Sequence, residues 1–501
     1  MTSATVGVNQ RVAWLLSVAR VLSASSKGAS REVFVEELRS YGISVDLTRI
    51  SRWESGSLFV PDRAIGAYEG VLGVPPGSFL AIRQGLGRSL TSEPPWRDTE
   101  RELNPAELDS LFLLIDSRQA RGGDWLALAS TLTGAGQIYL PSRTWADLCG
   151  HLIAELVRSV GFAYVTRYEA CSTLIRHPTA RRHMLRALGE YLTHPDVQIV
   201  APCLNLLQEI TDQGANDLLL RLMASDNPIL RKGAVAVAAG KAGQDQFADG
   251  DLLTLETHAV RILREHDSFA SGMDALELAT QLPEESFRNV HSAIRDSRTQ
   301  QHLEAARTTG ELVPHQLARS LSSTIATAAQ ANTPAAYTTE PDLMLQQLVR
   351  ESLFHVRKTR RYHASSLIAA SPYAPAVAHG CVDLISGENE FVALRSATML
   401  LRIGHGRRRE DLATHALHHA LPAIRSRALT SLGMSTVPLG PAETAVILAT
   451  LDTSSNEVAS AAIAALGMAG GPGITSLLDS PDTRRRQAAR WWTDLGPAVH
   501  D

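Results

Sequence analysis

Cysteine is scarce in this sequence, and long uncharged apolar runs are missing. The 501 residues include four cysteines, scattered along the chain without a Cys-x-x-Cys pair. This pattern argues against a disulfide framework or a cysteine zinc site and favours a reducing, cytoplasmic setting. No stretch approaches the roughly 18 apolar residues of a membrane span. The first apolar run is broken by Arg20 and lacks a cleavage-like site, so no signal peptide is expected.

Motifs that carry catalysis are missing as well. The sequence contains no phosphate-binding loop, no Gly-x-Gly-x-x-Gly, no Gly-x-Ser-x-Gly and no convincing carboxylate pair. We therefore expect no enzymatic activity, no catalytic residue and no cofactor. His415 and His419 lie one helical turn apart, as in a zinc-chelating pair, but no Glu follows the first and no third ligand is evident. We interpret them as an ordinary histidine face and predict no metal site.

Aromatic residues are few, at 5% of the chain, whereas alanine and leucine are abundant. This composition favours an all-α fold over a β-sandwich or barrel. The formal net charge of −4 is unevenly distributed, because residues 1–90 hold ten Lys and Arg against seven Asp and Glu, which leaves −7 on the rest. A mildly basic head on an acidic body fits a DNA-binding module attached to a part with another task.

The most informative stretch is residues 45–56, Val-Asp-Leu-Thr-Arg-Ile-Ser-Arg-Trp-Glu-Ser-Gly. Asp46 is a good helix N-cap, and Gly56 suits the left-handed end of a helix. At 100° per residue the inward side is apolar and consists of Val45, Ile50, Trp53 and the stem of Glu54. The opposite side and its flanks are small, polar or basic: Thr48, Arg49, Ser51 and Arg52. Such a helix suits insertion into a DNA major groove; an ordinary capped surface helix is the alternative.

The neighbouring segments make this helix the third of five within residues 1–88. Amphipathic segments precede it at 11–24 and 30–41, and another follows at 64–72. This order resembles the Cro/C1-repressor helix-turn-helix family, also called the XRE family. The residues that carry the resemblance are Ile50-Ser51-Arg52-Trp53-Glu54-Ser55-Gly56, Pro61, Tyr68 and Leu72-Gly73-Val74. Two features depart from the family: the turn from Gly42 to Val45 is longer, and the segment after Gly56 lacks a basic residue often found there.

The resemblance implies which side chains contact DNA. Leu47, Thr48 and Arg52 are expected to face base edges, with Arg52 placed for a bidentate contact to guanine. Phosphate contacts are expected from Ser30, Arg31, Arg49 and Ser51. One such helix reads too few base pairs for a unique site, so a homodimer on paired half-sites is expected.

The rest of the chain is predicted to be helical. The predicted units are the head (1–88), a linker with Pro94-Pro95 (89–103), a helical connecting region (104–180), helical repeats (181–319), a low-complexity loop (320–341) and further repeats (342–501). Repeat units open on Pro, Asp or Asn and continue into Ala- and Leu-rich helices. The last four openings, at 390, 422, 456 and 482, are 32, 34 and 26 residues apart, about two antiparallel helices each.

These units resemble HEAT-type repeats, including an early arginine at Arg395, Arg425 and Arg485. An α-helical repeat solenoid is therefore expected, with an irregular helical bundle as the alternative. Trp491-Trp492 near the end is interpreted either as a docking surface or as core. Three basic runs, at 357–361, 407–409 and 484–486, are interpreted as solvated charge, with an ancillary DNA contact as the alternative.

We interpret the chain as a sequence-specific transcriptional regulator in the cytoplasm, associated with the nucleoid. The repeat body is expected to mediate self-association and to bind a protein or small-molecule effector, without contact to a membrane. The Ala- and Arg-rich composition is similar to that of high-GC actinobacteria, where large regulators of this layout occur and some act on development or antibiotic production. The alternative is a non-enzymatic protein-interaction scaffold whose head does not bind DNA.

Overall fold

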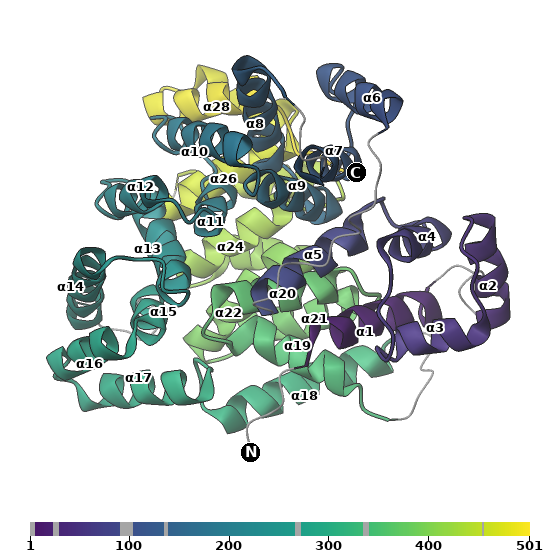
Figure 1. Ribbon diagram of the computed structural model, residues 1–501. Helices are drawn as coiled ribbons and strands as arrows, with labels where there is room; N and C mark the ends of the chain where they lie inside the picture. The colour runs from purple at the N-terminus through teal and green to yellow at the C-terminus, as the bar shows by residue number, and fades with distance from the viewer. Residues whose placement is uncertain are drawn as a thin grey trace.

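The computed structural model of the chain describes residues 6–23, 30–90, 104–134, 139–265, 272–333, 340–452 and 455–501. Within these ranges every regular element longer than an isolated bridge is a helix. This confirms the predicted all-α fold class. Figure 1 shows helices α1 to α4 at one edge of the molecule, beside a larger body of stacked helices.

The residues of the expected head form five short helices. They are α1 (Val8–Val21), α2 (Arg31–Ser40), α3 (Leu47–Glu54), α4 (Asp62–Leu72) and α5 (Ser78–Leu90). Aromatic rings hold the core between them: Phe34 of α2 meets Tyr68 of α4 edge-on at 4.7 Å, and Trp53 of α3 lies 6.5 Å from Tyr68. Such pairs add about 0.5–1.5 kcal/mol to the stabilisation from buried area.

The body contains the remaining helices. The first stretch comprises α6 (Pro105–Asp116), α7 (Gly122–Gly134), α8 (Ser142–Leu156), α9 (Gly161–Leu174), α10 (Pro178–Leu192), α11 (Ala201–Glu209), α12 (Gln213–Met223), α13 (Pro228–Ala242), α14 (Asp249–Glu265), α15 (Met273–Gln281), α16 (Glu284–Ala293) and α17 (Ser297–Thr309). The second comprises α18 (His315–Ala331), α19 (Leu343–Phe354), α20 (Lys358–Ala369), α21 (Ala374–Ile385), α22 (Glu390–Ile403), α23 (Arg409–His418), α24 (Pro422–Gly433), α25 (Pro441–Ala449), α26 (Asn456–Ala469), α27 (Pro472–Thr475), the 3₁₀ turn η2 (Ser476–Asp479) and α28 (Thr483–Leu495).

Two kinds of packing organise these helices. Consecutive helices pair, as α12 with α13, α21 with α22 and α23 with α24. Helices two apart also stack, in the series α13, α15, α17 and in the series α20, α22, α24, α26, α28. Each unit thus buries its apolar side against its neighbours in the chain, which is the packing of a helical repeat solenoid. The body is a HEAT-like α-helical repeat, as the sequence predicted.

Three of the last four predicted repeat openings act as helix caps, as does Asn227 before α13, whereas Leu421 before α24 has no capping side-chain hydrogen bond. The side chains of Asn227, Asn389, Ser455 and Asp482 each accept backbone N–H groups of the helix that follows, at 2.8–3.4 Å. These donors have no partner within their own helix, so the caps fix where each helix begins.

The early arginines satisfy carbonyl groups at the end of an earlier helix. The Nε atom of Arg425 donates to the carbonyl of Ala416 in α23 at 2.9 Å, and Nη2 of Arg485 donates to the carbonyl of Leu451 at 2.6 Å. Arg395 reaches the last turn of α19 in the same way. A cation is favourable at a helix C-terminus, where carbonyls lack helical partners. The arginines therefore tie successive helices together.

Aromatic side chains join the inner helices of the body. Tyr164 and Tyr168 of α9 lie 6.5 and 5.9 Å from Tyr362 of α20, and the guanidinium of Arg402 in α22 lies 4.3 and 4.6 Å from the rings of Tyr164 and Tyr362. Helix α5 also packs on α9 and α20. Helices α5, α9, α20 and α22 are thus in direct contact in this part of the body.

The C-terminal segment returns to the first helices of the body. The amide of Val160 donates to the carbonyl of Val499 at 3.1 Å, and the amide of Val499 donates to the carbonyl of Arg158 at 2.9 Å. Trp492 is buried against Gly467, and Trp491 meets Tyr191 of α10 edge-on. Trp491 thus helps to pack the last repeat against the first part of the body, whereas Trp492 packs it against α26.

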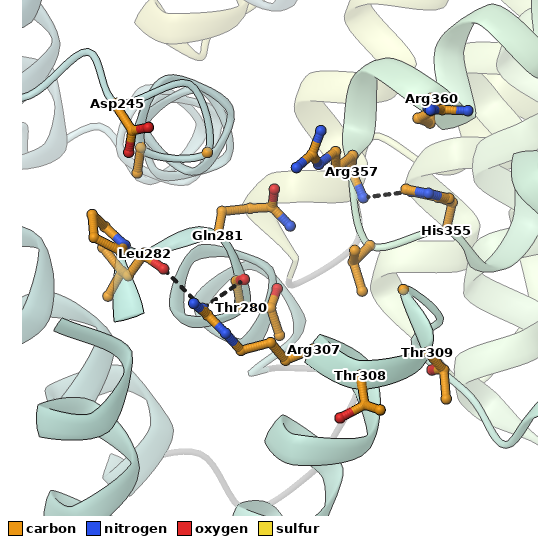
Figure 2. A pocket seen from close by; sticks show the side chains of 15 residues that line it. Asp245, Thr280, Gln281, Leu282, Arg307, Thr308, Thr309, His355, Arg357 and Arg360 are labelled. Atoms are coloured by element: carbon orange, nitrogen blue, oxygen red, sulfur yellow. Dashed lines mark hydrogen bonds between the residues drawn. The ribbon is translucent and has the colours of Figure 1, made fainter. Parts of the chain in front are cut away.

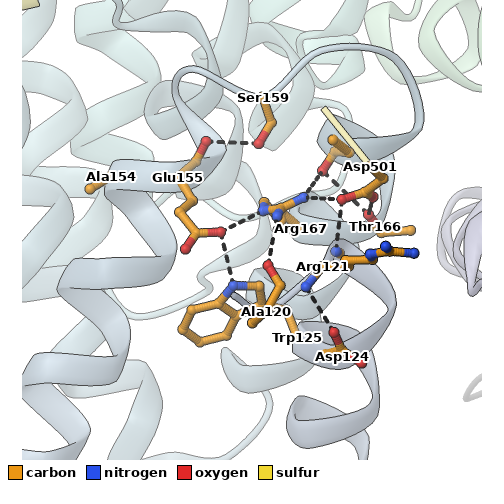
Figure 3. A network of polar contacts seen from close by, with 12 residues as sticks. Ala120, Arg121, Asp124, Trp125, Ala154, Glu155, Ser159, Thr166, Arg167 and Asp501 are labelled. Atoms are coloured by element: carbon orange, nitrogen blue, oxygen red, sulfur yellow. Dashed lines mark hydrogen bonds and ion pairs between the residues drawn. The ribbon is translucent and has the colours of Figure 1, made fainter. Parts of the chain in front are cut away.

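A buried charge network closes the same contact (Figure 3). The guanidinium of Arg167 lies 2.8 Å from the carboxylates of both Glu155 and Asp501, and its side chain is 2% exposed. The carboxylate of Asp501 also accepts from the amide of Gly122 at 2.9 Å. A buried cation needs this many partners because its desolvation is costly.

The prediction of a loop at residues 320–341 was wrong over much of that range. Residues 320–331 belong to α18, and 334–339 lie outside the described residues. The stretch has few bulky apolar groups, but Ser322, Ile325 and Ala329 recur at helical spacing and are buried. Small side chains let α18 approach α21, where a Cβ on Gly380 would lie 3.1 Å from Ile325. Close approach, rather than bulk, stabilises this helix.

The prediction that a linker begins at residue 89 was wrong. Ser89 and Leu90 complete α5, and residues 91–103 lie outside the described residues. Through α5 the head packs against the body, and the two share one continuous apolar core. At the contact a Cβ on Gly85 would lie 2.9 Å from the ring of His363, so α5 and α20 touch closely.

Three further expectations concern cysteines, membranes and metals. The four cysteines are free and buried, and burial raises the pKa of Cys149 to about 12. Over the part of the chain with described coordinates, no helix has the length and apolar content needed to cross a bilayer. No three His, Cys, Asp or Glu side chains gather there as a metal site would require. His419 accepts the amide of Leu421 at Nδ1, which gives it a role in the turn before α24.

Candidate nucleic-acid interface

Helix α3 is positioned by its cap and its inward side. The carboxylate of Asp46 accepts the amide of Arg49 at 2.7 Å, which fixes the start of the helix. Val45 and Ile50 are buried together, as a hydrophobic staple requires. Gly56 follows the helix with a φ of +74°, where glycine avoids the strain of a side chain. The local features that the sequence predicted for this helix are therefore present.

The outward side of α3 is exposed to solvent. All five residues expected there are exposed: Leu47, Thr48, Arg49, Ser51 and Arg52. Helix α3 packs on α1 and α2 and lies at the edge of the molecule in Figure 1. Neither Arg49 nor Arg52 forms an ion pair with any residue whose position is described. Both guanidinium groups are thus available to an anionic partner.

A buried ion pair with α1 fixes the last turn of α3. The carboxylate of Glu54 accepts from Arg20 of α1 at 2.5 and 2.8 Å, and both side chains are almost completely buried. The hydroxyl of Tyr68 donates to the same carboxylate at 3.4 Å. Burial and the charge of Glu54 raise the pKa of Tyr68 well above its usual value. The helical spacing predicts that Glu54 lies on the inward side, but no local pattern marks Arg20 as its partner.

The two residues expected at the start of α2 lie beside the end of α3. Ser30 caps α2 by accepting the amide of Val33 at 3.1 Å. Arg31 is half-exposed, and its Nε lies 3.6 Å from the carboxylate of Glu54. A helix N-terminus with a hydroxyl and a guanidinium is a suitable phosphate contact. The structure therefore places Arg31 beside the end of the helix that carries five of the expected residues, with Ser30 next to it in the chain.

The long turn between α2 and α3 has a defined structure. Gly42 has a φ of +73°, and the amide of Ile43 donates to the carbonyl of Leu38 at 3.1 Å. The guanidinium of Arg63 donates to the carbonyl of Gly42 at 3.1 Å. These bonds satisfy the last carbonyls of α2 and hold the turn beside α4.

The same region carries exposed apolar side chains. Val33, Tyr41, Leu47 and Leu58 are 47%, 50%, 43% and 37% exposed. They come from α2, from the turn, from α3 and from the segment after α3. Exposed apolar side chains of this size on the head can contribute to an interaction site.

Contacts between α1 and the body were not predicted. The guanidinium of Arg11 binds the carboxylate of Glu351 in α19 at 2.8 and 2.6 Å. The indole of Trp14 donates to the carboxylate of Asp342 at 2.9 Å and stacks on Tyr373 at 6.3 Å. An arginine and a tryptophan inside an amphipathic helix were the available sequence signal, but their partners lie more than 300 positions away.

The basic run at 407–409 is largely paired within the body, and the run at 484–486 is paired at its central residue. Arg408 lies 2.8 Å from Asp383, and Arg409 lies 3.3 Å from Glu443. Arg485 lies 3.1 Å from the exposed carboxylate of Asp452. These contacts leave little free positive charge in 407–409, and they engage the central arginine of 484–486.

Comparisons with known sequences give no family for this chain. No protein-family model matches the sequence. No curated protein matches it.

Solved structures give weak likenesses. The chain is similar to a chain in the structure of tubulin recruitment by microtubule polymerases with TOG domain arrays, with 11% identity, a TM-score of 0.23 and coverage of 80% of this chain and 94% of that one. It is similar to a chain in the structure of the karyopherin Kap121p bound to the C-terminus of the phosphatase Cdc14p, with 11% identity, a TM-score of 0.29 and coverage of 97% and 65%. It is also similar to a chain in the structure of Kap95p with RanGDP, with 12% identity, a TM-score of 0.28 and coverage of 97% of this chain and 73% of that one. Likenesses of this strength say nothing about what the chain binds.

Proposed function

We propose that the chain is a sequence-specific DNA-binding regulator in which α3 enters the major groove. The observation that supports this most directly is the two-sidedness of α3. Its inward side is fixed by Ile50, Trp53 and the Arg20–Glu54 pair, whereas Thr48 and Arg52 are exposed one turn apart. A rigid helix with free polar and guanidinium groups suits base recognition.

In the proposed complex, Leu47, Thr48 and Arg52 face base edges. A bidentate contact from Arg52 to guanine contributes about 1–3 kcal/mol of discrimination. Arg49 and Ser51 lie near one phosphate strand. Ser30 and Arg31, at the start of α2, lie near another phosphate and fix the register of the head.

The proposal includes a homodimer. Helix α3 has eight residues, and a single helix of this kind reads one half-site, so specific binding requires two heads about 34 Å apart. We assign self-association to the helical body. Light scattering on the purified chain tests this directly, because a dimer has twice the 54.1 kDa mass of one chain. A single-chain mass both free and bound to DNA contradicts the dimer.

The test of DNA binding is a gel shift with fragments of the source genome at increasing salt. We expect some fragments to be retained specifically and to dissociate as salt rises, because counterion release drives such binding. Recovery and sequencing of the retained fragments would then give the site. Absence of retention at low salt contradicts the regulator.

A second candidate is a protein-interaction scaffold. It is favoured by the exposed apolar residues Val33, Tyr41, Leu47 and Leu58 on the head, together with a helical repeat body. Substitution of Val33 and Tyr41 by serine separates the two candidates. The scaffold loses its protein partner in this variant, whereas DNA binding through Arg52 is retained.

A further inference from the structure

A polar cavity of about 540 Å³ lies where the two stretches of the solenoid meet. Its walls come from the ends of α13, α15 and α17 and from the turn between α19 and α20 (Figure 2). Ser89 of α5 lines a smaller adjoining cavity that shares Arg357 and Gln281. The cavity thus lies beside the helix that docks the head, and its volume is that of a small-molecule site.

Four basic residues are concentrated at the start of α20. They are Arg357 at the N-cap and Lys358, Arg360 and Arg361 in the first turn. This turn contains no acidic residue, and no side chain caps its amides. The N-terminus of a helix carries partial positive charge, so cations are disfavoured there unless an anion compensates them.

The protein provides a polar partner for two of these four residues. Arg361 lies 2.7 Å from the buried carboxylate of Glu277, and Lys358 donates to the side chain of Asn205 at 2.9 Å. Arg357 and Arg360 form no ion pair within the described ranges of the chain. Figure 2 shows the side chain of Arg357 extending from the start of α20 toward Gln281 and the centre of the cavity.

The surroundings of Arg360 increase this imbalance. Burial lowers the pKa of Arg360, and Glu351, which raises it, is already bound to Arg11. The nearby charges of Arg11 and Arg357 lower the pKa further. A partly buried cation of this kind would gain from a new anionic partner.

The remaining polar groups in the cavity are mainly donors. The Nδ1 atom of His355 accepts the amide of Arg357 at 2.9 Å, and burial lowers the pKa of His355 to about 4. The ring is therefore neutral at pH 7 and carries its proton on Nε2, which is a donor. Arg307 is bound to the carbonyls of Thr280 and Leu282. Asp245, on the opposite wall, is the one carboxylate among the lining residues.

We propose that this cavity binds a small phosphate ester. Its phosphate group is held by Arg357 and Arg360 and by the free amides at the start of α20, which match the oxygens of a phosphate in charge and geometry. The rest of the ligand lies toward Gln281 and Thr308. The site requires no DNA and is independent of the function proposed for α3.

The test is titration calorimetry on the full chain with inorganic pyrophosphate, and with glucose 6-phosphate against glucose. We expect both phosphates to bind, glucose not to bind, and R357Q/R360Q to weaken binding about tenfold or more. Arg484→Gln is the matched control, because Arg484 is exposed and remote from the cavity. Equal binding by wild type and R357Q/R360Q, or no binding to wild type, overturns the proposal.

Two further measurements distinguish loss of a phosphate site from loss of stability and from loss of DNA binding. Without ligand, R357Q/R360Q should melt at the same or a higher temperature than wild type, because it removes uncompensated cations from a helix N-terminus. A large decrease in melting temperature would mean that the two arginines are structural, which contradicts the proposal. Arg52→Ala, which concerns DNA binding, should leave pyrophosphate binding unchanged.

Discussion

Arg11 and Glu351 lie 340 positions apart in the sequence and form a buried two-point ion pair. The side chain of Arg11 is 1% exposed, and that of Glu351 is 12% exposed. Burial by itself raises the pKa of Glu351, but the hydrogen bonds and charge of Arg11 outweigh it and leave the pKa below its usual value. This pair and the contacts of α5 join the head to the body.

Removal of one partner from this pair should therefore be costly. In Glu351→Gln the guanidinium of Arg11 stays buried without a compensating charge, which costs about 3–5 kcal/mol. We expect the first transition in urea unfolding to shift to a lower midpoint. The measurement is circular dichroism combined with tryptophan fluorescence, because Trp14 lies at the same contact.

The matched control for this variant is Glu190→Gln, at an exposed position on α10. Its free energy of unfolding should equal that of wild type within about 0.5 kcal/mol. Equal midpoints for all three proteins would mean that the Arg11–Glu351 pair does not hold the head to the body.

The contact between α5 and α20 gives a second prediction. Gly85→Ala places a Cβ 2.9 Å from the ring of His363. Overpacking of this kind costs about 1–3 kcal/mol, which exceeds the gain of about 0.5–1 kcal/mol from replacing a helical glycine. Gly66→Ala is the control, because its Cβ would meet no atom within 4 Å other than its chain neighbours and the backbone of its own helix, and it should be stabilising. Stabilisation by both substitutions would show that α5 and α20 are loosely packed.

The sequence predicted the features that arise from neighbouring residues. The cap at Asp46, the buried side with Ile50 and Trp53, and the caps at Asn389 and Asp482 follow from spacing within a few residues. Such signals depend on backbone groups that each helix leaves unpaired at its ends, so they can be predicted from the local sequence without tertiary contacts.

Features that depend on distant contacts were not predicted. The pairs Arg11–Glu351 and Arg167–Asp501 join residues more than 300 positions apart, and no local pattern marks either partner. Helix α18 was interpreted as a loop because its small side chains carry little hydrophobic signal, although close packing against α21 stabilises it. The basic run at 357–361 was interpreted as solvated, whereas Arg361 is buried against Glu277.

A histidine at the docking contact predicts a pH dependence. Burial lowers the pKa of His363 to about 3, and four nearby arginines lower it further: Arg88, Arg11, Arg360 and Arg402. The folded state therefore keeps this ring neutral, whereas the unfolded chain binds a proton below its pKa of about 6.5. The contribution of neutral His363 to the stability of the folded state is complete above pH 6.5 and is lost as the pH falls from there toward 3.

Between pH 7.5 and 5.5 the loss attributable to His363 should be about 1.4 kcal/mol. The measurement is the urea midpoint at both pH values for wild type and His363→Gln. The variant cannot titrate at this position, so its free energy of unfolding should change between these pH values by about 1.4 kcal/mol less than that of wild type. An identical pH response in the two proteins contradicts the assignment.

The proposed DNA interface predicts different roles for Arg49 and Arg52, the two arginines of α3. Arg52 is assigned to a base edge, so Arg52→Ala should weaken specific binding by about 1–3 kcal/mol and leave nonspecific binding nearly unchanged. Arg49 is assigned to a phosphate, so Arg49→Ala should weaken binding to all sequences and reduce the salt slope by about 1. Both side chains are exposed, so neither variant should change the melting temperature. The measurement is fluorescence anisotropy with the selected site and a scrambled duplex at several salt concentrations. If both variants lose affinity equally for the two duplexes, α3 binds the backbone alone and the assignment of its outward side to base reading is wrong.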